Sequence, residues 1–233
     1  MVPVLLAVLL CTTARVGAQG VESATDADNT ARLQFIEHAL DAGQTAADRW
    51  WYGWLAAYSA AGIAQSALAV TTDDSHQRQD FAVGAMTSFV GAAGQFVFPL
   101  EAGRFAKALR AMPGETPEQR RAKLASAESY LERAARQEAF GRSWKSQASS
   151  LAVNAGAGLA TSLLFDRPAR DGLITFAIGQ AVSELQFFTQ PMKAVRDLAA
   201  YRRQHPGSRQ ASRAGAVWSV SLSASHVSVR RTF

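Results

Sequence analysis

The chain has 233 residues, with 24 Lys and Arg against 19 Asp and Glu, which gives a formal net charge of +5. Hydrophobic residues make up 48% of the sequence and charged residues 18%. This balance excludes an intrinsically disordered chain, because such chains contain far fewer apolar residues. The single cysteine, Cys11, excludes a disulfide scaffold and a cysteine-based zinc site. The length suits one large domain or two small ones.

Residues 1–18 have the features of a secretory signal peptide. Residues 4–10 (VLLAVLL) form an apolar run that is too short for a bilayer span of roughly 20 residues. Val16 and Ala18 stand where a signal peptidase needs small residues, although a basic segment before the run is missing. Cleavage after Ala18 would remove Cys11, so the mature chain would contain no cysteine. We therefore expect export to a bacterial cell envelope.

Helical signals dominate residues 19–205, which predicts an all-α domain. Thr30 is a candidate cap for a short amphipathic helix that ends at Gly43. Thr45 followed by Asp48 is typical of a capping box that opens a longer helix. Thr116, followed by proline at the first helical position, marks the start of a charged amphipathic helix at 117–140.

Four long segments of the chain contain almost no charge, and they fall into two pairs: 54–70 with 81–100, and 147–165 with 172–192. The units that contain these pairs, 45–112 and 143–204, resemble each other, with the helix at 117–140 as the connector. Asp80 matches Asp171 and Gln95 matches Gln186 at a constant offset of 91 residues. We predict two related helical hairpins that arose by internal duplication. Chance similarity between alanine-rich helices is the alternative.

Residues 206–233 form a basic linker and tail. The linker, 206–216, is rich in glycine, serine and arginine, as flexible linkers are. Residues 218–224 alternate apolar side chains with serine, which predicts one β-strand in the tail.

The uncharged segments fit either a bilayer or the core of a soluble bundle. Their lengths match a hydrocarbon core of roughly 30 Å, and aromatic residues around Trp50 resemble an interfacial belt. Basic residues concentrate in 101–146 and near the C-terminus, as in a positive-inside arrangement. A cleaved signal would put the basic connector outside, however. Either the signal is not cleaved, or the segments do not span a membrane.

Polar residues that are candidates for metal binding gather between the first two uncharged segments: Asp73, Asp74, His76 and Asp80. Carboxylates around a histidine are able to hold a hard cation or orient the imidazole. Helix capping is the alternative role of such a turn. Nucleotide loops and metalloprotease or serine-hydrolase motifs are missing from the sequence, so we predict no cofactor.

Glu184 is the only charge inside the fourth uncharged segment, and an ionisable residue within a membrane is a candidate functional site. We expect Arg104 or Arg196 to be its partner. The same ligand-binding hypothesis includes the tryptophan cluster, for which interface anchoring or core packing is the alternative: Trp50, Trp51 and Trp54. Buried amides such as Asn154 and Gln180 are expected to bond between helices.

These patterns favour an exported, membrane-embedded envelope protein with a non-enzymatic scaffold or interaction role. The expected partners are the lipid bilayer and a further helix or a second copy of the chain, but not nucleic acid. The alternative is a soluble periplasmic helical bundle that binds a lipid or another apolar ligand between its hairpins. An enzyme that uses Glu184 or the acidic turn is a third hypothesis.

Overall fold

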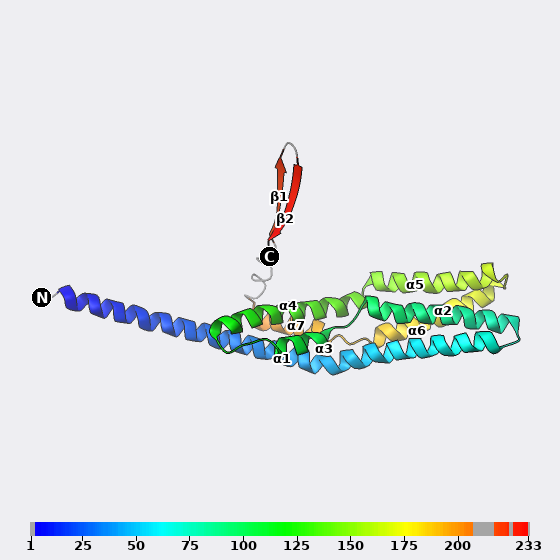
Figure 1. Cartoon of the computed structure of the whole chain (residues 1–233), viewed down its shortest axis with the longest axis horizontal. Helices are drawn as coiled ribbons and strands as arrows, with labels where there is room; N and C mark the ends of the chain where they lie inside the picture. The colour runs from blue at the N-terminus through cyan, green and yellow to red at the C-terminus, as the bar shows by residue number, and fades with distance from the viewer. Residues whose placement is uncertain (1–2, 207–216, 224–225, 233) are drawn as a thin grey trace.

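The computed structural model describes the backbone of residues 3–206, 217–223 and 226–232, and the side chains of residues 25–206. Its folded body is all-helical and elongated (Figure 1). The elements are, in chain order, α1 (Pro3–Thr71), α2 (Ser75–Val97), α3 (Ala102–Arg110), α4 (Pro117–Gly141), α5 (Trp144–Leu159), the π-helical turn η1 (Ala160–Leu164), α6 (Ala169–Thr189), α7 (Lys193–Gln204), β1 (Val217–Ser223) and β2 (His226–Thr232).

Helix α1 is one uninterrupted helix, so the predicted cap at Thr30 and the predicted break between Gly43 and Thr45 are wrong. The Thr30 hydroxyl donates to the carbonyl of Asp26, at 2.8 Å, and does not cap a helix. The buried face continues on both sides of Gly43, from Leu40 to Ala47. Tertiary packing of this face therefore overrides the local stop signals, as it commonly overrides weak propensities.

The predicted start of the charged helix is confirmed. Thr116 is the N-cap of α4, and its hydroxyl accepts from the backbone of Gln119, whose side chain completes a capping box. Pro117 occupies the first helical position, where its missing N–H is not needed. At the other end of the molecule, Asp166 has a φ of 51° in the turn between η1 and α6. Aspartate tolerates this left-handed conformation better than most residues.

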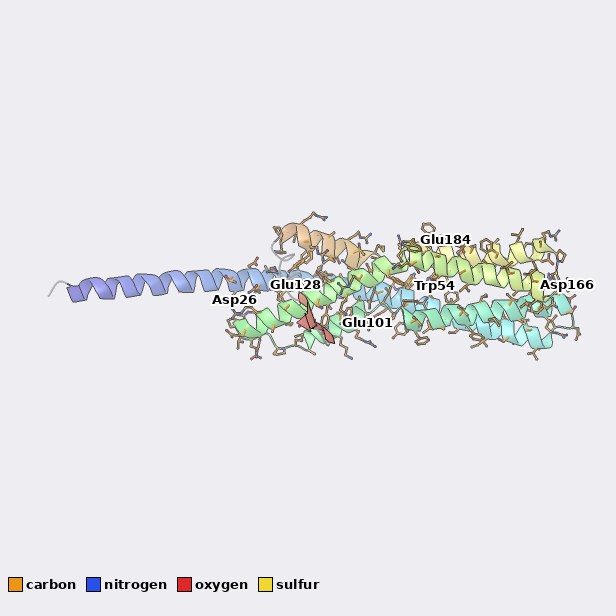
Figure 2. The ribbon with its side chains drawn as sticks, turned by 90° about the horizontal axis from the view of Figure 1, so that it is seen from above. Asp26, Trp54, Glu101, Glu128, Asp166 and Glu184 are labelled. Atoms are coloured by element: carbon orange, nitrogen blue, oxygen red, sulfur yellow. The ribbon has the colours of Figure 1, made fainter. Side chains whose placement is uncertain are left out.

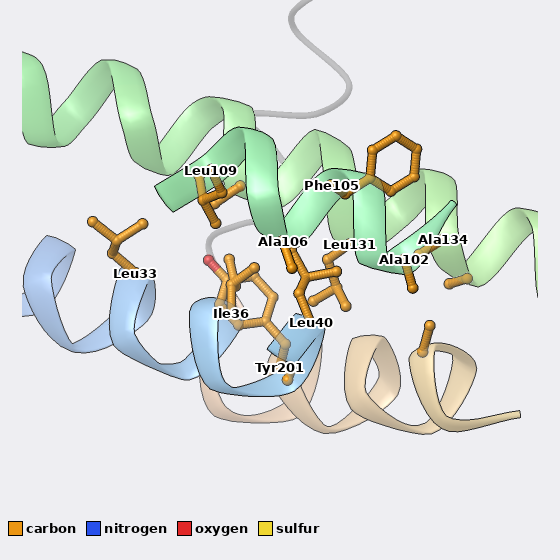
Figure 3. Packing of buried hydrophobic residues seen from close by; sticks show 14 of the residues in the cluster. Leu33, Ile36, Leu40, Ala102, Phe105, Ala106, Leu109, Leu131, Ala134 and Tyr201 are labelled. Carbon is orange, nitrogen blue, oxygen red and sulfur yellow. The ribbon is translucent and has the colours of Figure 1, made fainter. Parts of the chain in front are cut away.

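One half of the molecule, which we call the proximal bundle, consists of α1 residues 25–49 with α3, α4 and α7. Its core is apolar and tightly packed around Ile36, Leu40, Leu109 and Leu131, each at most 2% exposed (Figure 3). Ion pairs cross its helices, including Arg32–Glu128, Arg110–Asp41, Arg120–Asp26, Lys123–Glu37 and Arg202–Glu132. The proximal bundle thus has the apolar interior and charged exterior of a protein that folds in water.

The other half, the distal region, consists of α1 residues 50–71 with α2, α5, η1 and α6. Helix α1 packs along α2, and α5 packs along α6, whereas α2 and α5 make few contacts. Helices α5 and α6 approach closely at Gly158 and Gly172, where a Cβ on either residue would lie 2.4–2.5 Å from the other residue's carbonyl oxygen. Glycine is required there because no side chain fits between the two backbones.

Large apolar side chains cover the outer surface of the distal region. Exposed large apolar residues occur on all of its helices. Examples among the described residues are Ile63, Met86, Leu163, Leu173 and Leu185. The stretch from Ser75 to Arg110 is the one described helical segment that is long and apolar enough to cross a membrane. This finding alone is weak evidence, since core helices of soluble proteins meet the same criterion. In this stretch, however, only 17% of the most apolar window is buried.

The C-terminal strands pair as an antiparallel hairpin in which Val217 lies opposite Thr232. The sequence indicated only one strand, over 218–224, because the paired arginines at 230 and 231 interrupt the alternation in β2. Except for Pro206, the predicted linker lies outside the described residues. The side chains of the predicted signal peptide, Cys11 among them, also lie outside them.

Candidate functional site

A cavity of about 820 Å³ lies between the two helix pairs of the distal region. The first helix pair is α1 with α2, and the second is α5 with α6. Residues of α1, α2, α4, α5, α6 and the neighbouring turns line the cavity. Its volume is within the range of roughly 300–1,000 Å³ that is typical of small-molecule sites. It is the best candidate for a functional site in the part of the chain that the structure describes.

Hydrogen bonds from α1 to the end of α6 tie the helix pairs together beside the proximal bundle. The indole N–H groups of Trp50 and Trp54 donate to the Thr189 hydroxyl at 3.2 and 3.1 Å. The Tyr58 hydroxyl donates to the side-chain oxygen of Gln186 at 3.0 Å. Trp54 lies at this junction between the two halves of the molecule (Figure 2). These tryptophans, which the sequence suggested for ligand binding, use their donors to join helices.

The third tryptophan of the cluster has a similar role within the first helix pair. Trp51 donates its indole N–H to the backbone carbonyl of Gln95 at 2.8 Å. Its ring also meets Tyr52 and Phe96 edge to face, with centroids 4.8 and 5.8 Å away. Of the three tryptophans, only Trp50 also lines the cavity. The cluster therefore fixes α1 against its neighbours, and one of its members contributes to the wall.

An amide and hydroxyl network joins α5 to α6. The Asn154 side chain donates to Gln180 at 3.1 Å and to Ser183 at 3.0 Å. Gln180 in turn donates to the carboxylate of Glu184 at 2.8 Å. The prediction that these amides bond between helices is thus confirmed, and the structure shows that the two bond to each other. It arises because Asn154 is 6% exposed and needs partners inside the protein.

Glu184 does not meet the arginines that the sequence suggested as its partners. Arg104 pairs with Glu101 at 2.6 Å on α3, and Arg196 lies on α7. In the described part of the chain, no ion pair joins Glu184 to either of them. Both arginines belong to the proximal bundle, whereas Glu184 lies on α6 beyond the proline that separates α6 from α7 (Figure 2). The expected pairing is therefore wrong.

Arg167 closes the far end of the cavity by bridging the two helix pairs. Its guanidinium binds Asp171 at 2.8 Å and also pairs with Asp80 on the opposite helix pair. A further bond runs from Arg167 to the backbone carbonyl of His76, at 3.3 Å. Asp80 and Asp171 are one of the pairs that the offset of 91 aligns, and one arginine joins them.

The acidic turn does not assemble a metal site. Asp74 is the N-cap of α2 and accepts from the backbone of Gln77 at 2.8 Å, while Asp80 faces Arg167. Asp73 and His76 are exposed. The described residues contain no group of three or more His, Cys, Asp or Glu side chains placed to hold a metal ion. The turn caps a helix and ties two pairs together, which corrects the metal-binding hypothesis.

Glu138, which the sequence did not indicate, lies behind the proximal end of the cavity, next to the lining residue Gln137. It is 4% exposed, and its carboxylate accepts the backbone N–H of Val195 at 3.1 Å, at the start of α7. Gln190, which lines the cavity, donates to the Glu138 carbonyl at 3.0 Å. Burial raises the pKa of Glu138 to about 7, although the N–H groups of Val195 and Ala194 act in the opposite direction.

Glu138 and Arg167 were not identified as site residues from the sequence, because no local sequence pattern distinguishes them. Glu138 resembles the other charges of an amphipathic helix, and Arg167 resembles a residue of a solvated turn. The sequence did signal the polar lining of the cavity, through the amides of the uncharged segments, because an amide buried in such a segment needs a hydrogen-bond partner.

No protein-family model, curated protein or solved structure matches the chain.

Proposed function

We propose that the protein is an exported, membrane-embedded envelope protein whose distal region spans the bilayer. The observation that carries this proposal is the inverted distribution of side chains in that region. Large apolar residues such as Met86 (71% exposed) and Leu163 (74%) face outward, while Gln95 (4%) and Asn154 (6%) are buried. Water would favour the opposite arrangement, whereas hydrocarbon favours this one.

The dimensions of the distal region support the same proposal. Helix α2 has 23 residues and α6 has 21, so at about 1.5 Å per residue each is roughly 30–35 Å long. A bilayer core is roughly 30 Å thick. Exposed aromatic side chains gather where these helices meet the proximal bundle: Tyr52, Phe96, Phe98, Phe140, Trp144 and Phe188. Tryptophan and tyrosine are enriched at this depth in membrane proteins.

Both helix pairs start and end at the proximal bundle, so the bundle lies on one side of the proposed membrane. Exposed basic residues lie close to these aromatic side chains, among them Arg49, Arg142 and Lys145. By the positive-inside rule, they favour a cytoplasmic position for the proximal bundle. Cleavage after Ala18 would favour the exported side. The mass of the mature protein distinguishes these two topologies.

The role that we propose is a non-enzymatic scaffold or interaction role. Several polar groups of the cavity wall join helices, as at Trp50, Asn154 and Arg167. The uncovered apolar faces suit contact with lipid, with a partner helix or with a second copy of the chain.

The internal duplication is part of this proposal. The matched aspartates, Asp80 and Asp171, share Arg167, and the matched glutamines, Gln95 and Gln186, line one cavity. Each helix pair is followed by a proline and a short basic-ended helix, α3 or α7. Two related units facing each other across a cavity account for these correspondences.

Alkaline carbonate extraction of membranes from cells that express the tagged full chain tests the proposal. We expect the protein to stay in the membrane pellet, and the intact mass of that fraction reports whether residues 1–18 have been removed. Release into the supernatant would contradict the membrane-embedded proposal.

The alternative is a soluble periplasmic bundle that binds a lipid or another apolar ligand. The cavity of about 820 Å³ favours it, because small-molecule sites have this size. Protein purified without detergent would then carry a co-purifying lipid, which mass spectrometry after organic extraction detects. A detergent-free, lipid-free monomer would exclude both proposals.

A further inference from the structure

The wall of the cavity is rich in uncharged hydrogen-bonding side chains. They come from both helix pairs and from the end of α4: Gln65, Thr87, Ser88, Gln95, Gln137, Ser146, Ser149, Ser150, Asn154, Thr175, Ser183, Gln186 and Gln190. Several are buried, including Ser88 (9% exposed), Gln95 (4%) and Gln190 (4%). Aliphatic and aromatic side chains make up much of the rest of the wall. A mixed wall with this many hydrogen-bonding groups is expected to hold water or a ligand with polar groups, since cavities that stay empty are lined by apolar groups.

The charged groups of the wall are confined to its far end. Asp80, Arg167 and Asp171 are the charged residues among those that line the cavity, and they bind one another. Along the rest of its length, the wall offers amides, hydroxyls and aromatic rings, interspersed with aliphatic side chains such as Val83, Ile174 and Ile178. An ion there would lose its hydration without meeting an opposite charge, which is costly. An uncharged solute would exchange its hydrogen bonds with water for bonds to the wall.

We propose that the cavity is a hydrated binding site for an uncharged, hydrogen-bonding solute within the membrane-embedded region. This inference rests on the proposed function, because it requires lipid around the distal region and water inside it. The two helix pairs are joined at both ends of the site, by the Trp50–Thr189 bond at one end and the Asp80–Arg167 pair at the other.

Cysteine accessibility in membranes tests the inference. In a Cys11→Ser background, Ser183→Cys places a thiol on the cavity wall, and Leu185→Cys places one two residues away on the outer face of α6. Ser150→Cys and Leu151→Cys form a second matched pair on α5. Ala111→Cys, in the exposed turn after α3, reports labelling in bulk water. Methanethiosulfonates react with the thiolate, which forms in water and not in hydrocarbon.

With the uncharged reagent methyl methanethiosulfonate, we expect Ser183→Cys and Ser150→Cys to be labelled and their partners on the outer face to remain unlabelled. If the outer thiols react as fast as Ala111→Cys, the distal region lies in water and the proposed function is contradicted. If neither the inner nor the outer thiols react while Ala111→Cys does, the region lies in lipid but the cavity is dry. That result would overturn the inference alone.

Charged reagents test the class of ligand. We compare methyl methanethiosulfonate with its anionic sulfonatoethyl and cationic trimethylammonioethyl analogues, and divide each rate by the rate at Ala111→Cys. At Ser183→Cys, we expect both charged reagents to react roughly tenfold more slowly than the uncharged one, because the wall does not compensate their charge. Equal normalised rates, or a preference for one charge, would contradict an uncharged ligand.

Discussion

The proximal bundle and the distal region are built from helices of similar alanine-rich composition, but they distribute their side chains in opposite ways. In the bundle, Ile36 and Leu131 are buried and charged residues cover the surface. In the distal region, Met86 and Leu185 are exposed, while Asn154 is buried. This contrast is what the proposed function requires, with the bundle in water and the outer face of the distal region in lipid.

The bundle is stabilised by close packing of apolar side chains, and this gives the largest effect that we predict. Leu131→Ala should lower the free energy of unfolding by about 2–5 kcal/mol, since the side chain is 1% exposed and its removal leaves a void. Leu185→Ala, at 57% exposure, should cost less than about 1 kcal/mol. Thermal unfolding in mild detergent, followed by circular dichroism, measures both. Equal losses would remove the distinction between the two regions.

The second-largest effect that we predict comes from placing a charge on the outer face of the distal region. Met86 lies midway along α2 and is 71% exposed. Met86→Arg should disfavour insertion by roughly 2.5–3.5 kcal/mol, the cost of arginine at the centre of a spanning helix. The fraction recovered in carbonate-washed membranes should therefore fall. Ala125→Arg, on the exposed face of α4, is the control and should leave that fraction unchanged. Unchanged recovery of Met86→Arg would argue against lipid around α2.

Glu138 makes the stability of the junction depend on pH. Its pKa is raised to about 7 from an ordinary 4.5, so the folded protein holds a proton that the unfolded chain has released. Stability should therefore decrease as the pH rises from about 4.5 to 7, by on the order of 2–3 kcal/mol. Glu138→Gln should flatten this part of the profile. Unfolding measurements from pH 4 to 8 on both proteins test this prediction. If stability falls equally steeply with pH in the variant, Glu138 is not the source of the pH dependence.

The tie at the far end of the cavity should contribute least. Arg167→Gln removes the pairs with Asp80 and Asp171, whose side chains are 48% and 21% exposed, and should cost about 1–2 kcal/mol because solvent weakens such pairs. Arg170→Gln changes an exposed arginine three residues further along and is the matched control. The same thermal assay compares them. A loss above the effect of Leu131→Ala would mean that the far end, and not the bundle core, limits stability.

Local signals in the sequence predicted those helix ends that local chemistry decides. Thr116 and Pro117 start α4 where expected, because a side-chain cap and a proline act within one turn. Gly43 and Thr45 failed as signals because the buried face of α1 continues past them. For the candidate site, the sequence indicated the amides at Asn154 and Gln180 but not Glu138, which resembles any charge on an amphipathic helix.

The sequence by itself determined the all-helical class of the folded body and the existence of long uncharged segments, since both follow from periodicity and composition over a few turns. Only the tertiary structure decided which side chains those segments turn outward. It also decided that Arg167 and Asp80, 87 residues apart, meet at the end of a cavity. Such pairings depend on how distant helices pack against each other. No local pattern of residues encodes that arrangement.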